Sequence, residues 1–229
     1  MPRSLFPSAS PETRQRLERD STLKLLNEFD WAANPLGPIP DWPQSLKGAV
    51  RVMMAASTPM AMLIGPDGIL VYNQAYAEFA GNRHPAIFGL PVAEAWPEIA
   101  DFNRHKVEMG LRGESLILRD QELVLNRHGR LESGWMNLHY SPVLDEAGAP
   151  MGTLCIVHET TGHVIMAEER ELVSQELSHR IKNIFAVLTG IISLSARSRP
   201  EVKDFAAELR QRIYALGEAH DFVRPHSDA

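Results

Sequence analysis

The feature that most restricts how this chain can fold is a long proline-free segment in its C-terminal third. Residues 163–196 contain a single glycine, Gly190, and show no alternation of apolar and polar residues. This pattern predicts one uninterrupted helix. Residues at alternating intervals of three and four form a heptad seam along it, typical of a helix packed lengthwise on another. The seam consists of Ser174, Leu177, Ile181, Ile184, Leu188, Ile191 and Ser195.

A second helix is predicted directly after this segment. Residues 198–201 have the pattern of a capping box with a proline in the first turn. Two seamed helices joined by about four residues form an antiparallel hairpin. Because so small a hairpin leaves part of its seam uncovered, we expect two copies to pair as a four-helix bundle. The second seam consists of Val202, Ala206, Leu209, Ile213, Leu216, His220 and Val223.

The middle of the chain consists instead of short apolar runs separated by turn residues. The turn sequence at residues 65–68 predicts a hairpin of the first two strands, and residues 73–100 are broken into short helical pieces. A longer helix is predicted over 101–112. The order indicates an α+β domain, with helices across one face of a five-stranded antiparallel sheet. The predicted strands are 60–64, 69–72, 116–125, 133–143 and 151–159.

The first part of the chain is predicted to form two helices joined by a proline-rich connector. Helices are predicted over 13–31 and 44–57, and residues 34–43 include four prolines, which exclude both helix interiors and central strands. Trp42 in this connector indicates that it packs on a core. We therefore expect three parts: N-terminal helices and connector packed on the next domain (1–58), the sheet domain (59–160), and the helical hairpin (161–229).

Composition excludes several classes of protein. The net charge of −6 argues against non-specific nucleic-acid binding, and no segment approaches the ~20 apolar residues that span a bilayer. The first residues lack the apolar core of a secretion signal, and the single cysteine, Cys155, cannot form an internal disulfide. We expect a cytoplasmic protein that binds neither membrane nor nucleic acid. The histidines show no metal-ligand spacing, so no metal site is predicted.

One histidine lies where phosphoryl chemistry is possible. If Ser174 and Ile181 occupy the first heptad position, His179 falls opposite the seam and faces solvent. Arg180 and Lys182 flank it, and Asn183 lies one turn further. A neutral imidazole can attack phosphorus while nearby cations steady the phosphoryl oxygens. By spacing alone, an inert surface histidine is the more common explanation.

The sequence ELSHRIKN at residues 176–183 resembles the phosphoacceptor box of the HWE family of bacterial sensor histidine kinases. In that family the histidine is followed by arginine, an aliphatic residue, lysine and asparagine. Residues 212–221 are similar to the end of the family's dimerisation and phosphotransfer hairpin. Upstream, the order of strands and helices and the sequences at 30–39, 42–46 and 140–143 resemble PAS sensory domains that precede such hairpins.

The resemblance implies roles for five residues. His179 would be phosphorylated and would pass the phosphoryl group to an aspartate on a response-regulator receiver domain. Asn183 would position water for dephosphorylation, and Lys182 would steady phosphoryl oxygens. Arg180 stands where many other histidine kinases have an acidic residue, so Glu176, three residues before His179, is a candidate general base. A signal in the PAS domain would change the pitch or register of residues 160–172.

The resemblance also implies ATP and Mg²⁺ as cofactors of the complete kinase. Only six residues follow Val223, and no glycine-rich phosphate loop is present. We therefore expect this protein-histidine kinase fragment not to autophosphorylate alone. The chain is either a truncated kinase or a natural phosphotransfer protein that a separate kinase phosphorylates. Two alternatives stay open: a stand-alone histidine phosphotransfer or phosphatase protein, and a non-catalytic PAS dimerisation module.

No cofactor of the PAS domain can be identified from the sequence. Cys155 falls in a predicted central strand, where a buried apolar thiol is expected. Its neighbours do not resemble the sequence around the flavin-adduct cysteine of light-sensing PAS relatives. The sequence therefore gives no support for photochemistry.

Overall fold

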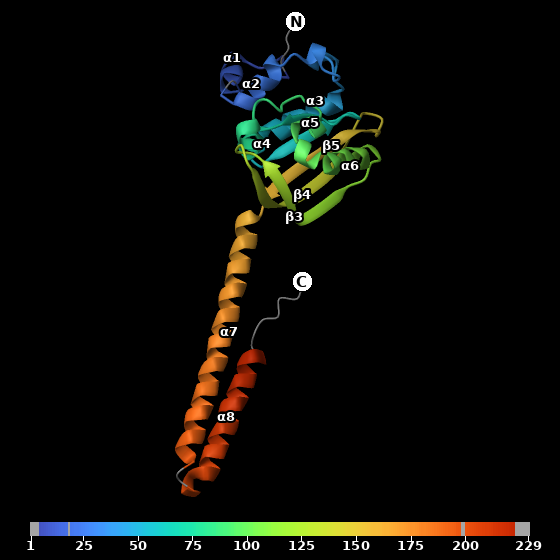
Figure 1. Cartoon of the computed structure of the whole chain (residues 1–229). Helices are drawn as coiled ribbons and strands as arrows, with labels where there is room; N and C mark the ends of the chain where they lie inside the picture. Colours follow the sequence, from blue (N-terminus) through green and yellow to red (C-terminus); the bar gives the residue numbers. More distant parts are fainter. Residues whose placement is uncertain (1–4, 18, 198–199, 223–229) are drawn as a thin grey trace. The chain divides into compact units, whose positions relative to one another are not determined.

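A computed structural model describes residues 5–17, 19–197 and 200–222 (Figure 1). The chain divides into two compact units, Met1–Val164 and Ile165–Ala229. Each unit is described by itself below.

The first unit is built on one antiparallel sheet with the strand order β2-β1-β5-β4-β3. The predicted α+β class with five strands is confirmed, and the strand ends differ from the prediction by two residues or fewer. Gly65 and Gly68, in the predicted turn between β1 and β2, both have positive φ, a conformation that glycine adopts without steric cost. The strands are β1 (Met60–Ile64), β2 (Ile69–Tyr72), β3 (Leu116–Asn126), β4 (Leu131–Leu144) and β5 (Pro150–Glu159).

Short helices cover one face of the sheet, as predicted. They approach it closely, because a Cβ added at Gly110 would lie 2.5 Å from Cβ of Thr153 in β5. Only a residue without a side chain lets the longest of these helices lie so near the strand. The elements are α4 (Gln74–Ala80), η3 (Gly81–Arg83), α5 (Val92–Ala95), η4 (Pro97–Ile99) and α6 (Ala100–Leu111).

The N-terminal region differs from the prediction at one point. The single helix expected over 13–31 is two helices, because the Asp20 carboxylate accepts a hydrogen bond from the Leu23 amide at 2.8 Å and caps a new helix. The apolar residues of this region share one continuous core with the sheet. The elements are α1 (Pro11–Leu17), α2 (Ser21–Glu28), η1 (Trp31–Ala33), η2 (Ile39–Asp41) and α3 (Gln44–Ala55).

The side chain of Asn73 joins three segments of this unit. It is fully buried between β2 and α4. Its Oδ1 accepts hydrogen bonds from the amides of Met60 and Tyr76. Its Nδ2 donates to the carbonyls of Met53, Ala56 and Thr58. One side chain therefore satisfies five backbone groups that would otherwise be buried without partners.

The second unit is a helical hairpin. Helix α7 (Thr161–Ala196), which starts in the first unit, is followed by η5 (Pro200–Val202) and α8 (Lys203–Phe222). The predicted uninterrupted helix is thus present, and a second helix follows it. Ser198 and Arg199 of the predicted capping box lie outside the described residues, as does Val223.

The seam predicted for α7 does not coincide with the row of residues that has reduced exposure. Ser174 and Ile181 are half-buried, but Leu177, Ile184 and Ile191 are each more than half exposed. The row with reduced exposure is instead Ser174, Ser178, Ile181, Phe185, Thr189, Ile192 and Ala196. Periodicity shows that a helix has an apolar side but not which neighbour covers each residue of it.

Candidate functional site

His179 lies on an exposed part of α7, as the heptad pattern predicted. The side-chain amide of Asn183, one turn along, lies 3.5 Å from Nδ1 of His179. This contact is made at Nδ1 and does not involve Nε2. The imidazole thus belongs to an exposed residue of a long helix, with one ring nitrogen outside this contact.

The other candidate residues of the sequence motif form their own contacts. The Arg180 Nε donates to the Glu176 carboxylate at 2.7 Å, one helical turn away. This hydrogen bond and the charge of Arg180 lower the pKa of Glu176, with a further contribution from His179. Glu176 is therefore anionic at neutral pH, and its carboxylate is engaged by Arg180. Its role as general base stays a prediction.

Lys182 lines a groove between α7 and α8. The groove has a volume of about 750 Å³, and Phe185, Arg210, Tyr214 and Glu218 also contribute to it. Arg210 donates a hydrogen bond across the hairpin to the Ser193 hydroxyl at 3.0 Å. The structure therefore brings together His179 and Asn183, and Glu176 and Arg180, whereas Lys182 lines the groove.

Polar contacts that the sequence analysis did not predict hold the start of α7 to the sheet. The Arg127 guanidinium donates to both carboxylate oxygens of Glu159, at 2.7 and 3.1 Å. The next residue, Thr160, donates its hydroxyl proton to Asp120 at 2.7 Å, and the Thr161 hydroxyl accepts from the Trp135 amide. We call these contacts the α7 anchor. They join β3 and β4 to the first turn of the helix that carries His179.

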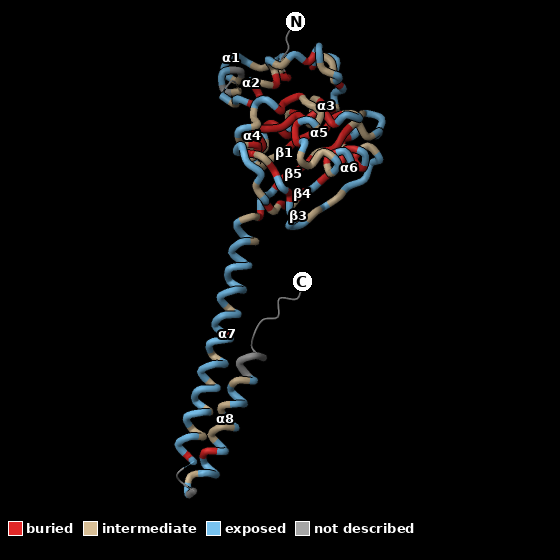
Figure 2. The backbone as a smooth tube through the Cα atoms, viewed as in Figure 1, coloured by how far each residue is buried: buried red, intermediate tan, exposed pale blue. Residues whose placement is uncertain are grey.

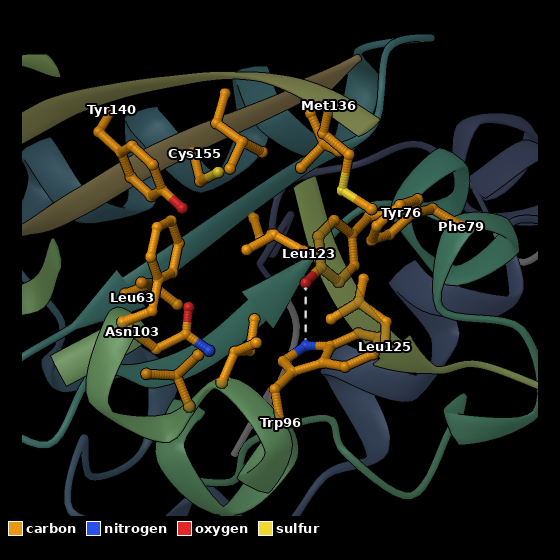
Figure 3. Close-up of a pocket in the computed structure, with 16 residues that line it drawn as sticks. Leu63, Tyr76, Phe79, Trp96, Asn103, Leu123, Leu125, Met136, Tyr140 and Cys155 are labelled. Carbon is orange, nitrogen blue, oxygen red and sulfur yellow. Dashed lines mark hydrogen bonds between the residues drawn. The ribbon is translucent and has the colours of Figure 1, made fainter. Parts of the chain in front are cut away.

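Residues of the anchor also contact residues that line the sheet domain's core. The Arg127 guanidinium lies over the ring of Phe79, 5.0 Å from its centroid. Phe79 lines a cavity between the sheet and helices α4–α6 (Figure 3). A continuous set of contacts therefore runs from the core to the beginning of α7.

The core cavity is small and mostly apolar. It encloses about 40 Å³. Its polar groups are few: the Tyr76 hydroxyl, which accepts from Trp96 at 3.1 Å, the Tyr140 hydroxyl beside the Cys155 thiol, and the Asn103 carboxamide. Burial raises the pKa of the thiol to about 12, so it is protonated at neutral pH. Cys155 is buried, as its position in the predicted strand implied.

Two further findings concern metal ligands and membrane-spanning helices. Within them, no group of three or more histidine, cysteine or acidic side chains could hold a metal ion. None of their helices is long and apolar enough to cross a membrane.

Comparison with known proteins assigns both units. Residues 176–228 match the family model described as HWE histidine kinase, and residues 55–164 match the model described as PAS fold. The match of the first model contains the ELSHRIKN sequence. The predicted resemblance to a PAS-containing histidine kinase of the HWE family is confirmed.

Two curated relatives carry similar names. The chain is 31% identical over 164 residues to blue-light-activated histidine kinase 1 of Erythrobacter litoralis. The alignment covers 68% of this chain and 44% of that protein. It is 26% identical over 207 residues to the blue-light-activated histidine kinase of Rhizobium johnstonii. That alignment covers 82% of this chain and 56% of that protein. The chain thus spans about half the length of the curated relatives it matches.

A solved structure of the PAS domain of Bordetella pertussis BvgS also aligns with this chain. The identity is 16% and the TM-score 0.41, and the alignment covers 58% of this chain and 98% of that one.

Proposed function

We propose that the chain, which joins a PAS fold to the HWE histidine kinase segment, is the sensory and phosphoacceptor portion of a bacterial two-component kinase. The observation that carries this proposal is His179, exposed on α7 with Nδ1 beside the side-chain amide of Asn183. An imidazole held in this way can receive and donate a phosphoryl group without moving the helix.

The transfer begins at Nε2 of neutral His179. This step requires the tautomer that carries the ring proton on Nδ1, with the side-chain oxygen of Asn183 turned to accept its hydrogen bond, so that the lone pair lies on Nε2. This nitrogen attacks the γ-phosphorus of ATP, an N–P bond forms, and the bond to the bridging oxygen breaks, so that ADP leaves with the electron pair. We place the ATP and its Mg²⁺ on a domain outside residues 1–229. A receiver aspartate then attacks the phosphorus, the N–P bond breaks, and imidazole is regenerated. Asn183 orients the ring in both steps, and Lys182 and Arg180 supply positive charge near it.

The exposed apolar residues of the hairpin support a homodimer. Leu177, Ile184, Ile191 and Leu216 are each between 55% and 60% exposed, and all belong to the predicted seams. Apolar side chains in a row along a helix are covered in a stable protein. A second copy with the same row would cover them in a four-helix bundle.

Phosphotransfer to the chain tests the proposal. The chain would be incubated with ATP and a separately produced ATP-binding domain of an HWE kinase, or with a phosphorylated receiver domain. We expect acid-labile phosphate on the chain and its absence from the His179→Ala variant. His163→Ala, which removes another exposed histidine of α7, is the matched control and should be labelled normally.

The two alternative functions predict different patterns of phosphate labelling. Labelling from the phosphorylated receiver but never from a kinase domain would favour a stand-alone phosphotransfer protein. Failure of both donors, with each shown to be active on another substrate, would refute phosphotransfer and leave a non-catalytic PAS dimerisation module.

A further inference from the structure

One polar group in the core of the PAS domain has no partner within the described part of the chain. Asn103, on α6, is 6% exposed, and its Nδ2 atom is buried without a hydrogen bond. A buried donor without an acceptor destabilises a fold, so such a group in a native protein requires an explanation. Asn103 lines the cavity between α6 and the sheet, among the side chains drawn in Figure 3.

The space beside Asn103 is large enough to hold a small molecule. A cavity of about 40 Å³ exceeds the roughly 10–15 Å³ that one water molecule requires, and it is well below the roughly 150 Å³ of a cavity that binds benzene. In the geometry of this structure, an occupant is therefore larger than one water molecule and smaller than benzene.

The lining of the cavity selects for a neutral occupant. Among the residues that the structure describes, no aspartate, glutamate, lysine, arginine or histidine side chain lines it. Burial raises the pKa of Tyr76 and of Tyr140, so both hydroxyls stay uncharged at neutral pH. A charged molecule would lose its hydration here without gaining an opposite charge.

The same cavity does not fit a flavin. A response to blue light, which the names of the curated relatives state for those proteins, requires a conjugated chromophore such as the three fused rings of a flavin. Sites for ligands of that size measure roughly 300–1,000 Å³, many times the volume present here. The Trp96 and Tyr76 rings, joined by a hydrogen bond, line part of the cavity and would have to separate from the sheet.

We propose that this PAS domain binds a small, neutral carbonyl compound, such as a short ketone or amide, in its core cavity and does not bind a flavin. The carbonyl oxygen accepts the hydrogen bond that Nδ2 of Asn103 donates. The alkyl part contacts the leucines of β3 and β4, of which Leu123 and Leu138 line the cavity. The occupant thus satisfies the buried donor and fills apolar space at once.

The experiment uses the side-chain amide resonances of Asn103 in the full 229-residue chain. Acetone, which has an acceptor and no donor, would be titrated and followed by nitrogen–proton correlation spectra. We expect saturable shifts of the Asn103 amide group and of methyl groups of Leu123 and Leu138. Xenon, which has no acceptor, should shift the methyl groups and leave the Asn103 amide protons nearly unchanged.

Three variants complete the test. In Asn103→Leu, acetone should bind at least tenfold more weakly while xenon binding is retained. Asn82→Leu, which removes an exposed asparagine away from the cavity, should bind acetone as the parent chain does. Ala61→Val adds methyl groups to a residue that lines the cavity and should weaken the binding of both probes.

Two outcomes would overturn the proposal. Linear shifts without saturation in the parent chain would mean that water alone occupies the cavity. A flavin that co-purifies with the chain, or binds when flavin mononucleotide is added, would show that the core opens to a large chromophore. Neither outcome bears on His179, because phosphotransfer is measured separately.

Discussion

The two units of this protein stabilise themselves in different ways. In the first, helices and connector bury a continuous apolar core against the sheet, whereas exposed residues predominate along α7 and α8 (Figure 2). Leu177 and Ile184 of α7 are 56% and 57% exposed, whereas Leu70 of β2 is fully buried. The difference indicates that the PAS unit contains its own core, whereas the hairpin depends on a partner for part of its burial.

An optical probe can follow the first unit by itself. All four tryptophans, Trp31, Trp42, Trp96 and Trp135, belong to the first unit, and the second contains none. Tryptophan fluorescence therefore reports unfolding of the PAS unit. The predictions below use this property.

The largest effect is expected for Asn73→Ala. The variant removes five hydrogen bonds, two of them buried and three part-buried, and should reduce the free energy of unfolding of the first unit by about 3 kcal/mol. Urea unfolding followed by tryptophan fluorescence measures this change. Asn82→Ala, at an exposed position, is the control. A loss below about 0.5 kcal/mol would mean that Asn73 does not hold the three segments together.

A change in the hairpin should affect association and leave the first unit intact. Ile191→Glu places a charge in the exposed apolar row of α7 and should weaken dimerisation roughly hundredfold. Sedimentation equilibrium measures the dimer, and the urea midpoint from tryptophan fluorescence should not move. Val52→Glu changes a residue of α3 that is 72% exposed and should leave dimerisation unchanged. An unaltered dimer in Ile191→Glu would contradict the proposed interface.

The smallest effect is expected at the α7 anchor. Glu159→Gln removes the charge that pairs with Arg127 and should destabilise the first unit by about 1 kcal/mol at pH 7, a value reduced because Glu159 is 38% exposed.

The loss of stability caused by Glu159→Gln should become smaller as the pH falls. Arg127 lowers the pKa of Glu159 in the folded state, so the stabilisation is complete above the unfolded value of 4.5 and is lost as the pH falls through the lower folded value. The stabilities of parent and variant, measured by urea unfolding, should converge in acid. A difference that does not shrink as the pH is lowered below 4.5 into acid would indicate that the charge of Glu159 is not its cause.

Much of this architecture could be predicted from local sequence. The turn at Gly65 to Gly68 located the first two strands, because positive φ at both glycines follows from local sterics. The sequence around His179 located the candidate phosphoacceptor, because a helix places residues of one motif on one surface. The helix predicted over 13–31 was wrong because the capping by Asp20 was overlooked, although its signal is also local.

The sequence by itself determined the order of the elements, the exposed position of His179 and the apolar character of the hairpin, since periodicity and turn chemistry act over a few residues. Only the tertiary structure decided which residues of α7 face α8, that Arg127 pairs with Glu159, and that Asn103 is buried without a partner beside a cavity. Arg127 and Glu159 lie 32 positions apart in the chain, and Ser193 of α7 and Arg210 of α8 lie 17 apart. The burial of Asn103 depends on how the sheet packs against the helices. Such contacts arise from packing in three dimensions and leave no periodic trace in the chain.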